Sequence, residues 1–282
     1  MINKEMIEAQ LQQLRNMGMT EDLIGTYRQQ IEASMQAAEQ MGVDIGQAYD
    51  TTMDSSITMS ETTDLTPEQQ WGIACGADLA LLNDHPLNTL ETDVSKSMIR
   101  QQLSDWWGVD GKDELQDMFN YLAEGGHRFR FAHVDKALRM SGTAEAKKYL
   151  KDNLNEDFDT AMDWFRNMRE AYEQFAEDGL LPENASLPNL IAWDYVRVIN
   201  LCRNGFDAKY ISKKEALEQI MITARKLQKE YSSWKELSVC YQFGRYVWGG
   251  DDQYEMLKEG MEELLSDENS PWINLDWNMK LI

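Results

Sequence analysis

The stretch from Ser212 to Glu230, SKKEALEQIMITARKLQKE, decides the fold class because each part of it is typical of an α-helix. Ser212 and Glu215 have the spacing of a capping box, in which each side chain binds the other residue's backbone amide. Apolar residues then recur at three- and four-residue spacing, which places them on one helix face. They are Ala216, Ile220, Ala224 and Leu227. The stretch predicts an amphipathic helix with one buried face.

The sequence around this helix has the same character. A helix is predicted from Leu187 to about Asn204, with Gly205 ending it, and Ser233 starts another that carries Leu237 and Trp248. A last helix is predicted near 251–266. The tail that follows, 271–277, holds two tryptophans, and we expect it to dock on the body because exposed indoles are unfavourable in water.

Towards the N-terminus the helical pattern continues. Thr66 and Pro67 are a strong helix start, and the helix that follows is predicted to reach about Leu82. Other helices are predicted from about Thr92 through Trp106, from Asp110 to the glycines at 125 and 126, and from Asp157 to Asp178, where Gly179 is the natural cap. Almost no segment alternates like a strand. We therefore predict an all-α fold, a bundle-like globular domain of many helices.

The chain is predicted to have two helical parts joined by a linker. Apolar residues at helical spacing predict a helical hairpin over 1–49. Residues 50–66 follow, of which nine are serine or threonine, and such side chains compete with a helix for backbone hydrogen bonds. The main α-helical domain is predicted over 67–282.

Charge narrows the class of partner. The chain has 49 acidic and 27 basic residues, a net charge of -22, which disfavours nucleic acid and anionic membrane surfaces as partners. The segment 191–249 is the exception, with six acidic and ten basic residues. Either this segment pairs internally with acidic residues, or the acidic surface steers a basic partner towards the protein.

The remaining composition predicts a cytoplasmic protein. A mean hydropathy of -0.57 and the lack of a long apolar run predict no membrane span. The first residues lack a basic region followed by an apolar stretch, so we expect no secretory signal. The three cysteines, Cys75, Cys202 and Cys240, are widely separated and odd in number, which favours a reducing compartment.

Familiar chemical motifs are missing from the sequence. It has no glycine-rich phosphate loop, no Cys-x-x-Cys pair and no His-Glu-x-x-His. The histidines are His85, His127 and His133, and the last two point to different faces if they share a helix. We predict no metal and no cofactor, and we assign no catalytic residue.

Several segments do combine aromatic and charged residues within apolar surroundings. The candidate group is His127, Arg128, Trp193, Asp194, Arg197, Trp234 and Arg245. One interpretation is a buried network in which Asp194 accepts hydrogen bonds from Arg197, His127 or Arg245 and fixes helix positions, since a lone buried charge is costly. The other is an interhelical cleft that holds an anionic ligand or polarises a substrate.

In these segments the sequence resembles a bacterial family of proteins with a domain of unknown function, numbered twelve sixty-six. The similarity lies in Trp107-Gly108, Gly126-His127-Arg128, Trp193-Asp194 with Arg197, Tyr210-Ile211-Ser212, Ser233-Trp234 and Gly244-Arg245. It covers roughly 71–249, and it departs from the family's pattern at Ala208-Lys209, where a glycine is commoner. The resemblance implies no activity, catalytic residue or cofactor. Some relatives lie among toxin and immunity genes.

Three functions follow from these observations. The first is a non-catalytic, cytoplasmic protein-binding module, in an immunity-like form one that neutralises or docks a basic partner. The second is an enzyme or small-anion-binding protein that uses His127, Asp194, Arg197 and Arg245 in a cleft. The third is self-association through the N-terminal hairpin, which deletion of residues 1–50 would test.

Overall fold

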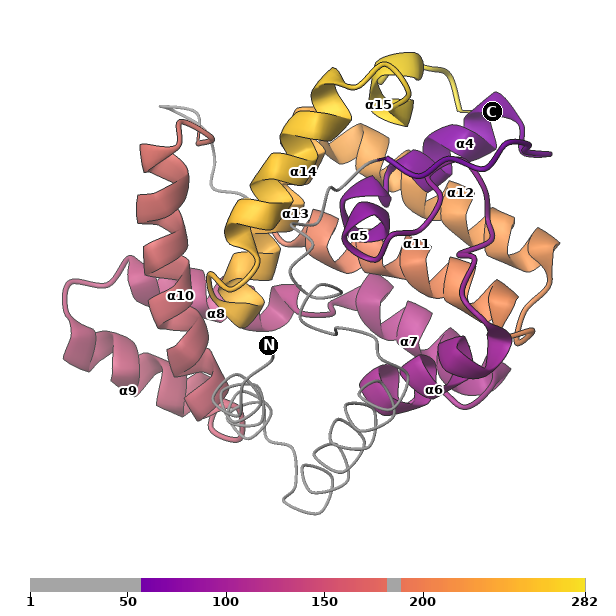
Figure 1. Ribbon diagram of the computed structural model, residues 1–282. Helices are drawn as coiled ribbons and strands as arrows, with labels where there is room; N and C mark the ends of the chain where they lie inside the picture. Colours follow the sequence, from indigo (N-terminus) through magenta and orange to yellow (C-terminus); the bar gives the residue numbers. More distant parts are fainter. Residues whose placement is uncertain (1–56, 182–188, 282) are drawn as a thin grey trace, which may run out of the picture. The chain divides into compact units, whose positions relative to one another are not determined.

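Helix α11, Ile191–Asp207, lies in the middle of the fold in a computed structural model of the protein (Figure 1). The chain divides into two units, 1–54 and 55–282, and the structure describes residues 57–181 and 189–281. These residues form helices, turns and loops without a β-strand, so the all-α prediction is confirmed. The predicted hairpin over 1–49 lies outside the described residues.

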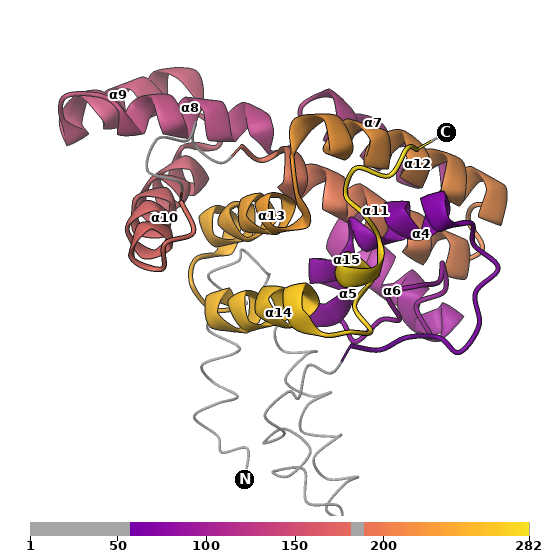
Figure 2. The same ribbon diagram turned by 90° about the horizontal axis from the view of Figure 1, so that it is seen from above.

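The other helices surround α11 or extend the fold to one side of it. In chain order the described helices are α4 (Pro67–Ala74), α5 (Ala77–Leu82), α6 (Lys96–Trp107), α7 (Lys112–Glu124), α8 (Arg128–Leu138), α9 (Thr143–Asn153), α10 (Phe158–Glu177), α11, α12 (Lys213–Glu230), α13 (Trp234–Gly249), α14 (Tyr254–Ser266) and α15 (Pro271–Asn274). Helix α11 packs against α5, α6, α7, α12 and α13. Figure 2 shows α8, α9 and α10 gathered on the far side of α13 from α4 and α12.

The predicted helix starts agree with the observed caps. The Thr66 hydroxyl accepts from the Gln69 amide and the Gln69 side chain accepts from Thr66, which completes a capping box ahead of α4. Ser212 and Glu215 form the predicted capping box of α12, and Ser233 caps α13. These side chains satisfy amides that the first turn of a helix leaves free.

Two of the predicted boundaries that are wrong involve a glycine. The helix predicted to run to Leu82 is broken at Gly76, which separates α4 from α5 and where an added Cβ would stand 3.1 Å from the side chain of Ile199. Gly205 does not end α11, which continues to Asp207. A Cβ on Gly205 would stand 2.5 Å from the side chain of Leu115, so this glycine lets α7 approach α11 closely.

Two residues after the end of α11, Lys209 has a positive φ of 62°. This is the left-handed conformation that glycine adopts most easily. The departure from the family pattern at Ala208-Lys209 therefore falls at the residue whose backbone favours glycine.

Helices α8 and α9 were not predicted. The residues that precede them, His127 and Gly142, make no side-chain cap to the helix that follows. Helix α6 also begins later than predicted, at Lys96, because Thr92 binds Asp207 through both its amide and its hydroxyl, at 2.8 and 2.6 Å from Asp207 Oδ2.

The C-terminal tail docks on the body, as predicted. Trp272 and Trp277 are buried and pack with Trp71 and Trp234, with ring centroids 4.7 to 5.8 Å apart. Each of these four indoles donates to a backbone carbonyl, those of Ala74, Tyr231, Asp276 and Leu275. The described end of the predicted linker, 57–66, has no helix, and its Ser60 pairs with Asn88 through two hydrogen bonds of 2.8 Å. None of the described helices has both the length and the apolar character needed to cross a lipid bilayer.

Candidate functional site

The turn between α7 and α8 meets the first turn of α11, and this contact joins most of the predicted polar group. Gly126 in the turn has a positive φ of 51°. A Cβ on Gly126 would stand 2.5 Å from Asp194 Oδ2, so only a glycine lets the turn approach the carboxylate this closely. The next residue, His127, precedes α8, and Arg128 is the first residue of α8.

The Asp194 carboxylate is fully buried and accepts hydrogen bonds through both oxygens. Oδ2 accepts from Arg128 at 2.8 Å. Oδ1 accepts from the His127 amide at 3.3 Å and from an Arg197 guanidinium nitrogen at 3.2 Å. A buried carboxylate needs such partners because its isolated charge would be strongly destabilising.

Arg197 completes the group from the same helix. Its guanidinium lies 4.2 Å from the centroid of the Trp193 ring and donates from Nε to the Trp193 carbonyl at 3.1 Å. It also lies 5.2 Å from the Trp107 ring. A guanidinium stacked on indole rings is favoured by the cation–π interaction. The structure thus joins His127, Arg128, Trp193, Asp194 and Arg197, which we call the Asp194 cluster.

The proton on His127 follows from its neighbours. Nδ1 lies 2.7 Å from an Arg197 nitrogen, which is always a donor, and 3.2 Å from Asp194 Oδ1. The shorter contact makes Nδ1 an acceptor and places the proton of the neutral ring on Nε2. Burial lowers the pKa of His127 below its ordinary value of 6.5, and the charge of Arg197 lowers it further, against the effect of Asp194. His127 is therefore neutral at neutral pH.

The structure places the other two predicted residues elsewhere. Trp234 packs in the tryptophan group beneath the C-terminal tail. Arg245 donates from Nε and a terminal nitrogen to Gln253 Oε1, at 3.1 and 2.9 Å, and lies 5.1 Å from the Trp248 ring. Arg245 was one of the donors expected for Asp194. In the described part of the chain, Arg128 donates to Asp194 and Arg245 donates to Gln253 instead.

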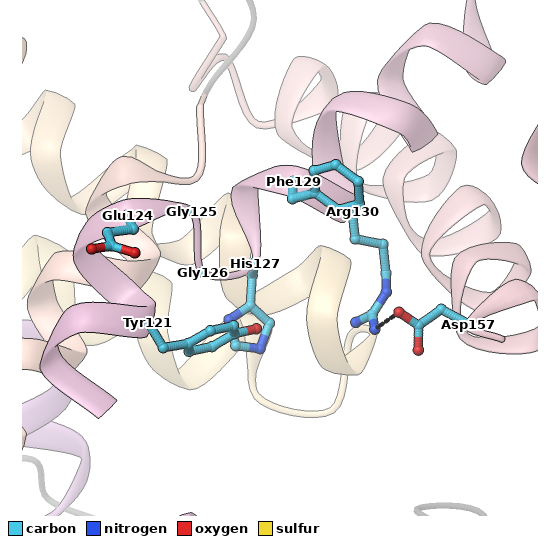
Figure 3. Close-up of a pocket in the computed structure, with 8 residues that line it drawn as sticks. All are labelled: Tyr121, Glu124, Gly125, Gly126, His127, Phe129, Arg130 and Asp157. Carbon is cyan, nitrogen blue, oxygen red and sulfur yellow. Dashed lines mark ion pairs between the residues drawn. The ribbon is translucent and has the colours of Figure 1, made fainter. Parts of the chain in front are cut away.

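A pocket of about 400 Å³ opens beside the cluster, on the side of α8 (Figure 3). It is lined by Tyr121, Glu124, Gly125, Gly126, His127, Phe129, Arg130 and Asp157. Its size lies towards the lower end of the range for small-molecule sites, about 300–1,000 Å³. Of the Asp194 cluster, His127 reaches it, with 15% of its side chain exposed, while Asp194 stays sealed behind the turn.

Sequence reasoning missed most of this lining. Arg130 forms an ion pair with Asp157 in the pocket wall, in which Nη2 of Arg130 lies 2.7 Å from Oδ2 of Asp157. Asp157 was expected only as a helix start, yet its carboxylate binds Arg130 and makes no cap to α10. Arg130 also lies 5.0 Å from the Trp164 ring, which stacks on His127. No spacing in the sequence marks these pairs, because α8 and α10 meet only in the folded chain.

Comparison with known proteins places this site within a family. The pattern of the family described as "Protein of unknown function (DUF1266)" matches residues 102–277, which contain the Asp194 cluster and the pocket. The match begins later than the predicted residue 71 and extends beyond the predicted residue 249, so it includes the C-terminal tail. No solved structure matches the chain.

Two curated proteins of Escherichia coli (strain K12) are similar. The "Uncharacterized protein YbeR" is 31% identical over 160 residues, 56% of this chain and 62% of YbeR. The "Uncharacterized protein YbeU" is 23% identical over 183 residues, 64% of this chain and 72% of YbeU. The chain thus aligns with less than two thirds of YbeR.

Proposed function

The chain belongs to the DUF1266 family, and we propose that it acts as a non-catalytic binding module that docks a basic protein partner. The observation that carries this proposal is the state of the Asp194 cluster. Asp194 is fully buried, and its two oxygens bind Arg128, Arg197 and the His127 amide. A carboxylate satisfied in this way joins α7, α8 and α11, which supports a bracing role and leaves recognition to the exterior.

The charge distribution supports the same proposal. The mildly basic segment 191–249 directs two of its arginines inward, since Arg197 and Arg203 are buried. Arg203 donates to the carbonyls of Pro86, Leu90 and Glu91 and so fixes the loop before α6. Two aspartates, Asp78 and Asp194, are buried as well, so the buried formal charges of the described residues balance. The chain's net charge of -22 therefore comes from its other residues, and it would attract a basic partner from a distance. An immunity-like role, with a basic toxin as partner, is one form of this proposal.

We place the protein in the cytoplasm within this proposal. Cys75, Cys202 and Cys240 are buried free thiols, and burial raises the pKa of Cys240 to about 12. Protonated, buried thiols serve as small apolar residues in the core.

A second function, binding of a small anion or chemistry on one, is favoured by one observation. His127 and Arg130 both line the pocket, and the Asp194 cluster fixes the His127 ring. An imidazole held in one tautomer can transfer a proton, and a guanidinium can hold a carboxylate or phosphate. Titration with inorganic phosphate, followed by NMR at His127, tests this function directly.

The test of the leading proposal uses the full chain. Cross-linking in the native cell should recover a basic protein, and the purified pair should associate with a rate constant that falls roughly tenfold from low to physiological ionic strength. Recovery of no basic protein, or an association rate that salt does not change, would contradict the proposal.

A further inference from the structure

The rim of the pocket is aromatic and open to solvent. Tyr121 at the end of α7 is 50% exposed and Phe129 in α8 is 62% exposed. Both line the pocket, where Tyr121 lies beside His127 with ring centroids 6.1 Å apart. In Figure 3 the Tyr121 ring extends from α7 towards His127, between Glu124 on one side and the Arg130–Asp157 pair on the other. Exposed rings beside a cavity offer flat apolar surface to a ligand.

The charges of the lining leave one carboxylate unmatched. Arg130 is neutralised by Asp157 at 2.7 Å, and His127 is neutral at neutral pH. Glu124 is exposed and has no ion pair or hydrogen bond within the described part of the chain. The lining therefore carries one net negative charge, from Glu124, which lies on the same helix as Tyr121.

We propose that this pocket receives a cationic side chain, the guanidinium of an arginine or the ammonium of a lysine, from the partner. The inference rests on the proposed function and names the group that the module recognises. A guanidinium can stack on the exposed face of Tyr121 or Phe129, and the carboxylate of Glu124 in the same lining attracts its charge. The protein's charge of -22 favours the approach of the same ligand.

An anion fits the pocket less well. Arg130 already pairs with Asp157, so an anion bound to its remaining N–H donors would face two carboxylates, Glu124 and Asp157. The neutral His127 offers it no charge. Charge complementarity thus selects a cation for this pocket.

The experiment titrates the full-length protein with N-acetylarginine amide, N-acetyllysine amide, the neutral analogue N-acetylcitrulline amide and inorganic phosphate. Binding is followed by amide NMR shifts of Gly125 and Gly126. We expect arginine amide to bind, lysine amide to bind the same residues, and citrulline amide to bind at least tenfold more weakly. Binding of phosphate in preference to the cations, or of citrulline as well as arginine, would overturn the proposal.

Variants locate the effect at the pocket. Glu124→Gln, at an exposed position, should weaken arginine amide at least tenfold, and Tyr121→Ala should weaken it severalfold. Asp117→Asn is the matched control, because Asp117 is an exposed carboxylate two turns earlier on α7 and does not line the pocket. It should change the affinity less than twofold. Equal losses in Glu124→Gln and Asp117→Asn would reduce the effect to general charge and overturn the pocket assignment.

The two proposals fail in different ways. If the native partner is basic and binds Glu124→Gln as tightly as the wild type, the pocket assignment is wrong and the proposed function stands. If arginine amide binds through Glu124 and no basic protein is recovered from the cell, the proposed function is wrong and the site is a receptor for a small cation.

Discussion

Gly126 and Asp194 lie so close that there is no room for a methyl group between them. A Cβ on Gly126 would stand 2.5 Å from Asp194 Oδ2, and the glycine has a φ of 51°. This contact lets the His127 amide and the Arg128 guanidinium reach the carboxylate, at 3.3 and 2.8 Å. The turn between α7 and α8 is thereby fixed against α11, and the pocket opens on its outer side.

Gly126→Ala should therefore destabilise the protein by more than the cost of placing an alanine in a left-handed backbone conformation. Gly108 is the matched control, because its φ is 62° and a Cβ there would meet nothing within 4 Å. Gly108→Ala should cost about 1 kcal/mol of unfolding free energy, the usual penalty of a left-handed residue. Gly126→Ala should cost at least about 2 kcal/mol more, because the added methyl displaces a carboxylate from its partners. Urea unfolding measures both, and equal costs would mean that the contact with Asp194 is unimportant.

His127 should titrate below the ordinary histidine value of 6.5, because burial and Arg197 disfavour its charged form. Proton and nitrogen NMR should also show Nδ1 without a proton, since it accepts from Arg197. A histidine whose folded pKa is lowered stabilises the fold above pH 6.5, and that stability is lost as the pH falls below this value. A pKa above 6.5, with the proton on Nδ1, would contradict this assignment.

A second buried carboxylate gives stability the opposite pH dependence. Burial raises the pKa of Asp78 from 3.8 to about 6, although Ser238 donates to its Oδ1 at 2.6 Å. Its Oδ2 and the Oε1 of Gln242 both lack a donor in the described structure. The stabilisation that Asp78 contributes is full below pH 3.8, where its carboxyl is protonated in both states, and is lost as the pH rises through about 6.

Asp78→Asn should remove this dependence. The variant should be more stable than the wild type at pH 8, by on the order of 3 kcal/mol, and closer to it at pH 4, since one pKa unit corresponds to about 1.4 kcal/mol. The difference in unfolding free energy between variant and wild type, measured at both pH values, cancels the other titrating groups. A difference that does not change with pH would refute the assignment.

Two neighbouring residues of the tail should contribute unequally to stability, because one is buried and the other is exposed. Trp272 is 4% exposed and donates to the Ala74 carbonyl at 2.8 Å, whereas its neighbour Ile273 is 51% exposed. Trp272→Ala should cost about 3–5 kcal/mol, as large-to-small changes in a core do. Ile273→Ala should stay within about 0.5 kcal/mol. Chemical denaturation followed by far-ultraviolet circular dichroism checks both, and a small loss in Trp272→Ala would mean that the tail is not part of the core.

Local signals in the sequence were sufficient for three of the helices that begin with a side-chain cap, but not for α6, which Ser95 caps and which was predicted to begin near Thr92. Thr66, Ser212 and Ser233 each start a helix as predicted. Helices α8 and α9 begin without such a cap, so the sequence carries no local signal for their starts. The sequence predicted a helix that continues through Gly76 and one that ends at Gly205, because a close approach by a residue such as Ile199 or Leu115 leaves no trace in the local sequence.

The part of the candidate site that could be predicted is the pairing of its buried charges. Asp194 and Arg197 are three residues apart on an apolar helix, and a buried charge requires a partner, so a network was expected. Arg128 donates to Asp194 because the turn at Gly126 brings it there. Arg245 and Trp234 lie outside the Asp194 cluster because of the way α13 crosses the fold. The pocket depends on the meeting of α8 with the start of α10, which no spacing in the sequence encodes.

We propose that the Asp194 carboxylate braces the turn between α7 and α8 against α11, a claim that a double-mutant cycle with Arg128 can examine. Unfolding free energies are measured for the wild type, Asp194→Asn, Arg128→Met and the double variant. We expect Asp194→Asn to cost about 3–5 kcal/mol and the pair to be coupled by at least about 1 kcal/mol. Losses that add to within about 0.5 kcal/mol would contradict the claim, since independent sites behave in that way.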